Sequence, residues 1–291
     1  MDSKKKYSIR KEFLSFKRKH RSPADKFLAS SAVFWFIIAF IGHLIFVLYI
    51  FGLYGISLFQ GDFERWNAMM PKGYTEGDIA GNINIGIHLI LAAVISLGGP
   101  LQIIPSLRKW FPTFHRWNGR TYVSTAIIIS LTGFYLTWIR GSTGVPFVID
   151  GAFYMDIAIT INGILIILFA LIAIRYAMAR NFTVHRKWAL RLFMVVSGVW
   201  FFRLGFMLWM LIHQRPVGFD PATFQGPFLT FLSFAQYLLP LFFLEIYFWA
   251  QERAGQTGKV STAILIAVLA IATAAGIFGA TMGLWLPPFK S

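Results

Sequence analysis

The chain has 291 residues, of which 57% are apolar and 13% charged, and its formal net charge is +15. It contains no cysteine, which excludes disulfides, thiolate metal sites, iron–sulfur clusters and covalently attached c-type haem. Several uncharged apolar runs reach the roughly 20 residues that cross about 30 Å of hydrocarbon, which excludes an ordinary soluble domain. The positive charge follows membrane topology, and no folded soluble face carries it, so we expect no nucleic-acid partner.

The first 26 residues form a basic arm that contains ten of the 27 Lys and Arg residues. Ile9, Phe13 and Phe16 would share one face of a surface helix bound to anionic lipid. We prefer the simpler interpretation that the arm is a cytoplasmic orientation signal. The apolar run that follows is too long for a cleaved signal peptide.

Seven apolar segments of spanning length follow the arm, and they lie at about 28–53, 81–104, 120–139, 152–178, 188–213, 228–250 and 260–286. We therefore predict an all-α seven-transmembrane helix bundle, which forms a single domain over residues 27–291. The outer segments hold few basic residues: Arg65, Lys72, Arg140, Arg215 and Lys290. The positive-inside rule then places the N-terminus inside and the C-terminus outside, in a bacterial inner membrane.

Three of the predicted spans carry a histidine or an arginine at a similar depth in the outer half of the membrane. His43, His88 and Arg203 all fall roughly 10–15 Å from the outer end of their helices, counted at 1.5 Å per residue. Such side chains are costly in hydrocarbon and are by default candidates for function. We therefore predict that these three residues form a cofactor- or ligand-binding site in the outer half of the membrane. Arg203 needs a partner there, and Asp156 is the nearest charge by predicted depth.

Two basic hairpins resemble each other and predict a second site on the cytoplasmic side. Each has a His-Arg pair with a tryptophan close by, Trp117 in the first and Trp188 in the second. The residues of this candidate anion or docking site are His115, Arg116, Arg120, His185 and Arg186. The hairpins could be a weak internal repeat, but Trp and Arg also belong at an inner membrane interface for structural reasons alone.

Two further features leave alternatives open. Glu245 lies in the inner half of the sixth span, where it would either pair with an arginine of a basic hairpin or handle protons. Ala275, Gly279 and Gly283 give the last span a face of small residues that allows close helix approach. Its partner is either an internal helix or a second subunit, as in a homo-oligomer.

The segment LGGPLQIIPSLRKWFPTFHRWNGRTYV, preceded by His88, resembles a family of predicted bacterial membrane proteins of unknown function. Members carry an intramembrane histidine, a Gly-Pro-Leu-Gln-type helix end and a His-Arg-x-x-Gly-Arg-x-Tyr hairpin. A second His-Arg hairpin follows, as VHRKWALRLF does here with Arg203 downstream. The resemblance covers about residues 80–205 and implies no activity. A looser similarity connects the histidine-bearing bundle to b-type cytochromes and ferric-reductase-like bundles, but fold analogy carries no mechanism.

Three functions compete at this stage. The first is a redox protein with one haem b between His43 and His88, which would serve as metal ligands only in that role, and with Arg203 near a propionate. The second is a transporter or binding protein for a small anionic or amphipathic ligand. Against the first, no second histidine pair lies in the inner half; against the second, no inverted repeat or paired broken helices are evident.

The third function is an accessory or assembly subunit, whose polar groups only pack helices. Catalytic residues are not identified, and whether the protein is an enzyme stays open. A hydrolase is disfavoured because no His-Glu-x-x-His or Ser-His-acid spacing occurs.

Overall fold

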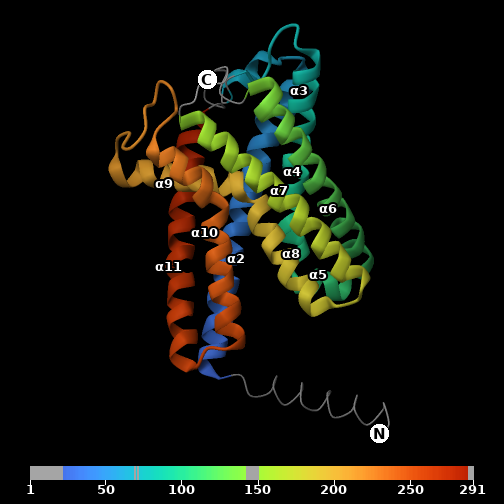
Figure 1. Ribbon diagram of the computed structural model, residues 1–291, viewed down its shortest axis with the longest axis vertical. Helices are drawn as coiled ribbons and strands as arrows, with labels where there is room; N and C mark the ends of the chain where they lie inside the picture. The colour runs from blue at the N-terminus through green and yellow to red at the C-terminus, as the bar shows by residue number, and fades with distance from the viewer. Residues whose placement is uncertain (1–21, 69, 71, 142–150, 288–291) are drawn as a thin grey trace.

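The computed structural model describes residues 22–68, 70, 72–141 and 151–287. Within this part of the chain the structure is helical, and no strand forms beyond one isolated bridge between Asp220 and Gln225 (Figure 1). The predicted surface helix with Ile9, Phe13 and Phe16 lies outside the described residues.

The first span begins earlier and ends later than the sequence indicates. Helix α2 (Pro23–Ile50) starts with a capping box, in which the Ser22 hydroxyl accepts the Asp25 backbone N–H and the Asp25 carboxylate accepts the Ser22 N–H. It continues through a π-helical turn (Phe51–Gly55) into α3 (Ile56–Gln60). Gly61 ends the helix with a left-handed φ of 73°, which favours glycine.

Prolines divide the segment that carries the first basic hairpin. Helix α4 (Ile79–Ile103) is followed by the short α5 (Pro105–Trp110) and then by α6 (Pro112–Tyr135). Both later helices begin with proline, which lacks the N–H that a first helical turn leaves unpaired. A π-helical turn (Leu136–Gly141) extends α6 at its far end.

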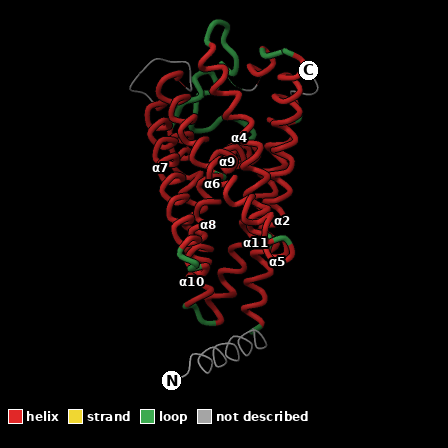
Figure 2. The backbone as a smooth tube through the Cα atoms, turned by 90° about the vertical axis from the view of Figure 1, so that its right-hand side faces the viewer, coloured by secondary structure: helices red, strands yellow, loops and turns green. Residues whose placement is uncertain are grey.

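The fifth span is broken, whereas we expected one continuous helix over 188–213. Helix α7 (Gly151–Met178) precedes α8 (Phe182–Val196) and α9 (Gly198–His213), which meet at an angle of 53°. Ser197 leaves helical geometry between them with φ −77° and ψ 3°. Figure 1 shows α9 lying across the long axis of the bundle, and Figure 2 shows it nearly end on.

The last two spans pack beside the first. Helix α10 (Pro227–Glu252) leads to α11 (Gln256–Ala280), which ends in a π-helical turn (Thr281–Trp285). Helix α11 packs along α2, and the Lys259 ammonium pairs with the Asp25 carboxylate at 2.7 Å. The small-residue face of α11 is turned toward α9, where an added Cβ at Gly279 would lie 2.8 Å from Leu211 Cδ1. The partner of that face is thus a helix of the same chain.

Six described helical segments are long and apolar enough to cross a membrane, and the α8–α9 pair makes a seventh if it is one span. The predicted all-α polytopic bundle is therefore confirmed, and contact with a lipid bilayer follows. Its orientation stays a prediction, so we name the two ends by structure. The cap end carries the segment 61–78, and the hairpin end carries α5 and the α7–α8 turn (Figure 1).

The described residues form four apolar core clusters, of which two are large. One lies toward the cap end, around Phe46, Trp200 and Trp285. The other joins α6, α7, α8 and α10 around Tyr122, Leu192 and Tyr237. The candidate site lies at the edge of the first cluster.

Candidate functional site

A cavity of about 380 Å³ opens among α2, α4, α6, α7 and the α8–α9 junction. His43, His88 and Arg203, the three residues predicted to form the outer-half site, all line it. Most of the lining is aliphatic or aromatic, and the remaining polar groups include Ser96, Ser130, Asn162 and Ser197. The structure thus brings the predicted set together around one space; its binding role stays a prediction.

His43 lies at the α8–α9 break and is fully engaged by the protein. Its Nδ1 lies 2.8 Å from the Ala39 carbonyl oxygen, so Nδ1 carries the proton that is donated. The ring's Nε2 lies 3.3 Å from the Ser197 hydroxyl, which therefore donates to it. The imidazole also stacks on Trp200 with ring centroids 4.2 Å apart. These contacts hold a neutral imidazole in a fixed orientation.

His88 is anchored on one side only. The Thr132 hydroxyl donates to the Ile129 carbonyl at 3.0 Å, so it accepts from His88 Nδ1, which lies 2.9 Å away. This assigns the proton to Nδ1 and leaves Nε2 as an acceptor. No hydrogen bond to that Nε2 forms within the described part of the chain.

Arg203 has no carboxylate partner among the described residues. Its guanidinium lies over the Phe46 ring at 5.2 Å and donates one weak hydrogen bond to the Val199 carbonyl at 3.3 Å. None of the ion pairs formed among the described residues includes Arg203. Asp156, the charge nearest by predicted depth, is not among the residues that line the cavity. A cation at this position therefore faces the cavity with most of its donors unused.

The break in the fifth span forms part of the cavity wall, and it was not predicted from the sequence. Gly198 permits the close approach of α7, because an added Cβ would lie 2.8 Å from Asn162 Nδ2. Asn162 is 5% exposed, and its Oδ1 has no hydrogen-bond partner among the described residues. An acceptor left in this state costs free energy, which a bound donor would recover.

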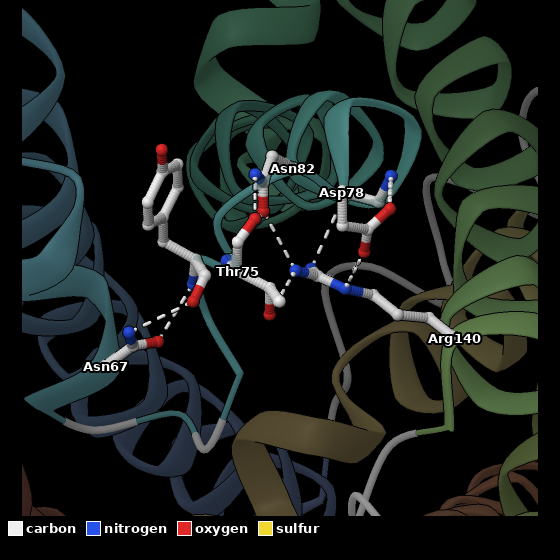
Figure 3. Close-up of polar contacts among 7 residues, drawn as sticks. Asn67, Thr75, Asp78, Asn82 and Arg140 are labelled. Carbon is white, nitrogen blue, oxygen red and sulfur yellow. Dashed lines mark hydrogen bonds and ion pairs between the residues drawn. The ribbon is translucent and has the colours of Figure 1, made fainter.

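Met70 and Lys72 of the cap segment line the cavity, and Arg140 binds the end of that segment beside α4, as Figure 3 shows. Arg140 Nε lies 3.0 Å from Asp78 Oδ2, and its terminal nitrogens donate to Asn82 Oδ1 at 2.9 Å and to the Gly81 carbonyl at 3.2 Å. The Asn82 amide in turn pairs with both backbone groups of Thr75, at 3.0 and 2.7 Å.

A second amide clamp lies within the cap. Asn67 pairs with both backbone groups of Tyr74, at 2.8 and 3.0 Å (Figure 3). The Trp66 side chain, 4% exposed, packs beneath it against Tyr54 and Phe63. From the sequence, Arg140 was predicted only as an outer-loop charge. Asp78, Asn67 and Asn82 are the polar residues of the sequence that could have indicated its role.

The cavity lining is positively charged. Lys72, Arg140 and Arg203 line it, and no Asp or Glu of the described chain does. The Arg140 charge is offset by Asp78, which stands just outside the lining. The cavity therefore combines an apolar wall with the charge of Arg203, which no acidic residue of the described lining offsets.

The residues of the predicted cytoplasmic-side site lie at the hairpin end. His115 and His185 are within electrostatic range of each other. The Arg120 guanidinium lies 5.0 Å over the Trp117 ring, and Arg116 donates to the Thr113 hydroxyl at 3.3 Å. Arg186 is exposed in the same region.

Glu245 pairs with an arginine of the second basic hairpin, which was the first of its two predicted roles. Its carboxylate receives two hydrogen bonds from Arg191, at 2.6 and 2.9 Å, which joins α8 to α10. A second pair, Lys187 with Glu252, joins the same helices.

The described residues hold no group of three or more His, Cys, Asp or Glu side chains that could bind a metal ion. A haem b needs only two protein ligands, so two facing imidazoles with free Nε2 atoms would suffice. Here His43 Nε2 already accepts from Ser197, and the ring is stacked on Trp200. The residues in this arrangement do not fit bis-histidine haem ligation.

Comparison with known proteins identifies a family. A family model described as "Predicted membrane protein (DUF2306)" matches residues 85–239, more than half of the chain. The matched segment includes His88, both hairpins, the α8–α9 break and Arg203, but not His43. No curated protein and no solved structure matches the chain, so the looser similarity to b-type cytochromes has no support.

Proposed function

The chain belongs to the predicted membrane protein family DUF2306, whose function is unknown, and we propose that this member binds a small amphipathic anion in the cavity beneath the cap. One observation carries the proposal: Arg203 lines a largely apolar cavity with no carboxylate partner among the described residues and no acidic residue in the lining. An unpaired guanidinium is costly in a membrane, and a ligand carboxylate or phosphate would offset that cost.

The size and wall of the cavity define the rest of the ligand. A volume of about 380 Å³ lies within the roughly 300–1,000 Å³ range of small-molecule sites. Ile85, Leu89, Ile129 and Phe134 belong to the wall and suit an alkyl or aromatic body. His88 Nε2 supplies an acceptor for a hydroxyl group near the anionic end. The ligand class is an amphipathic carboxylate or phosphate of modest size.

Transport, as distinct from binding, is favoured by the broken fifth span. Helix breaks at substrate cavities recur in transporters because they free backbone groups and permit rearrangement. The break at Ser197 lines this cavity. It is one broken helix rather than a pair, so binding is our primary proposal and transport the second candidate.

Binding is tested with matched ten-carbon probes on detergent-purified full-length protein. Decanoate should raise the midpoint of thermal unfolding and bind in calorimetry, while decanol and decyltrimethylammonium should do so much less. In Arg203→Gln the affinity for decanoate should fall about 10- to 100-fold, the equivalent of losing one charged hydrogen-bonded contact of about 1.5–3 kcal/mol.

The matched control is Arg215→Gln, which removes the same charge from an exposed loop residue that does not line the cavity. Equal binding of all three probes, or equal loss in both variants, would contradict the proposal. An absorbance spectrum of the same sample before and after reduction tests for haem b. A Soret band that shifts on reduction would mean that haem, and not an anion, occupies the cavity. If no probe binds and no Soret band appears, the result favours the accessory-subunit function over ligand binding.

A further inference from the structure

The hairpin end carries basic residues that the cavity does not use. The hairpin patch is the surface formed by α5, the start of α6 and the start of α8, with the residues Arg108, Lys109, His115, Arg116, Arg120, His185 and Arg186. None of the ion pairs among the described residues includes a member of this patch. Two acidic residues of α10 that contact α8, Glu245 and Glu252, are already paired with Arg191 and Lys187.

The centre of the patch holds a polar atom without a partner. His115 Nδ1 is buried and makes no hydrogen bond within the described chain. The Arg108 and His185 side chains lie within electrostatic range of it, so positive potential converges on this imidazole. His185 itself donates from Nδ1 to the Ala173 carbonyl at 2.9 Å, which fixes its ring beside the end of α7. An anion seated here would offset the positive charge of the surrounding side chains.

Exposed aromatic rings surround this centre. Trp110, Phe111 and Trp117 are 70%, 60% and 62% exposed, although buried placement is usual for such side chains in a soluble fold. Lys109 lies 5.2 Å from the Trp110 ring, and Arg120 lies 5.0 Å from the Trp117 ring. Tryptophan beside a basic side chain is typical of residues at headgroup depth, where the ring enters the acyl boundary and the cation remains in water.

We propose that the hairpin patch is a binding site for the headgroup of an anionic phospholipid, with Arg108, His115 and His185 around the phosphate and the exposed rings against the acyl chains. The rings distinguish this site from one for a free anion, since a soluble phosphate would gain nothing from Trp110, Phe111 and Trp117. The site lies at the opposite end of the bundle from the cap and does not depend on the cavity ligand.

The test measures thermal unfolding of the full-length protein in a neutral detergent with added phosphatidylglycerol, phosphatidylcholine or inorganic phosphate. Phosphatidylglycerol should stabilise the protein and the other two should not. In Arg108→Gln the half-effective lipid concentration should rise about 10-fold, because the headgroup phosphate loses one charged hydrogen-bonding partner in its site. Arg116→Gln/Arg120→Gln should show a larger rise.

The matched control is Arg253→Gln, an exposed residue in the α10–α11 turn at the same end of the bundle. All variants keep the basic arm, so its contribution cancels. Equal lipid responses in the wild type and Arg108→Gln, or equal losses in Arg108→Gln and Arg253→Gln, would overturn the proposal. Full stabilisation by inorganic phosphate alone would assign the patch to a free anion instead. Arg203→Gln should keep the full lipid response, which separates this site from the cavity.

Discussion

Two arginines face the same cavity and are treated by the protein in opposite ways. Arg140 is held on several sides: its side chain is 7% exposed, paired with Asp78, and bonded to Asn82 and to the Gly81 backbone. Arg203 has one weak backbone hydrogen bond and a ring contact. The first arginine fastens a loop to the bundle. The second keeps its charge available, and this contrast is the basis for assigning ligand binding to Arg203.

The largest loss of stability is expected when the Arg140 side chain is replaced. Arg140→Gln should destabilise the protein by about 3 kcal/mol, because it leaves Asp78 uncompensated and frees the cap. Thermal unfolding in detergent measures the loss, and Asp78→Asn supplies the partner variant. The double variant should be less destabilised than the sum of the two single variants, since both remove the same contact. Strict additivity would mean that the ion pair does not hold the cap.

The packing of α11 on α9 predicts a smaller loss. Gly276→Ala should cost about 1–3 kcal/mol, because its Cβ would lie 2.9 Å from the Leu204 carbonyl oxygen, which is backbone and cannot turn aside. Gly255→Ala is the matched control, since nothing lies within 4 Å of its Cβ position. Similar unfolding midpoints for the two variants would show that α9 and α11 are not in close contact.

The anchoring of His88 predicts a loss of about 1 kcal/mol. Thr132→Val keeps the shape of the side chain but removes the hydroxyl that accepts from His88 Nδ1 at 2.9 Å. Thr273→Val is a matched control, because its hydroxyl only donates to the Leu269 carbonyl within its own helix. A loss in Thr273→Val as large as in Thr132→Val would argue against a specific His88–Thr132 contact.

Arg203 itself should show the smallest effect on stability. In Arg203→Gln the unfolding midpoint without ligand should stay unchanged or rise slightly, because the substitution removes an unpaired charge and no ion pair. Thermal unfolding beside Arg140→Gln checks the expected contrast. A destabilisation as large as that of Arg140→Gln would mean that Arg203 is a structural residue.

The helix bundle and the grouping of His43, His88 and Arg203 were predictable from the sequence. The break at Ser197 and the contacts of Arg140 with the cap segment were not. Hydropathy marks the spans because about 20 apolar residues are needed for each crossing. Depth along straight helices was enough to group His43, His88 and Arg203. Depth along a helix does not show which way a side chain points, so it suggested Asp156 as a partner of Arg203. The ion pairs of the described chain do not contain that contact.

The break at Ser197 was hidden because serine and glycine are ordinary residues in membrane helices. A tertiary contact accompanies it: an added Cβ at Gly198 would lie 2.8 Å from Asn162 Nδ2 of α7. Arg140 was hidden for a similar reason, since its partners come from a distant loop and the start of α4. Contacts of this kind depend on which helices become neighbours, and a single sequence does not state that.

The measurement that tests the central claim most directly is calorimetric binding of decanoate to the wild type, Arg203→Gln and Arg203→Lys. We predict saturable binding to the wild type, a loss of about 10- to 100-fold in Arg203→Gln, and partial recovery in Arg203→Lys, which restores the charge but not the paired donors. Binding of equal strength to all three proteins, or no binding to any, would contradict the assignment of Arg203 as the anion-binding residue of the cavity.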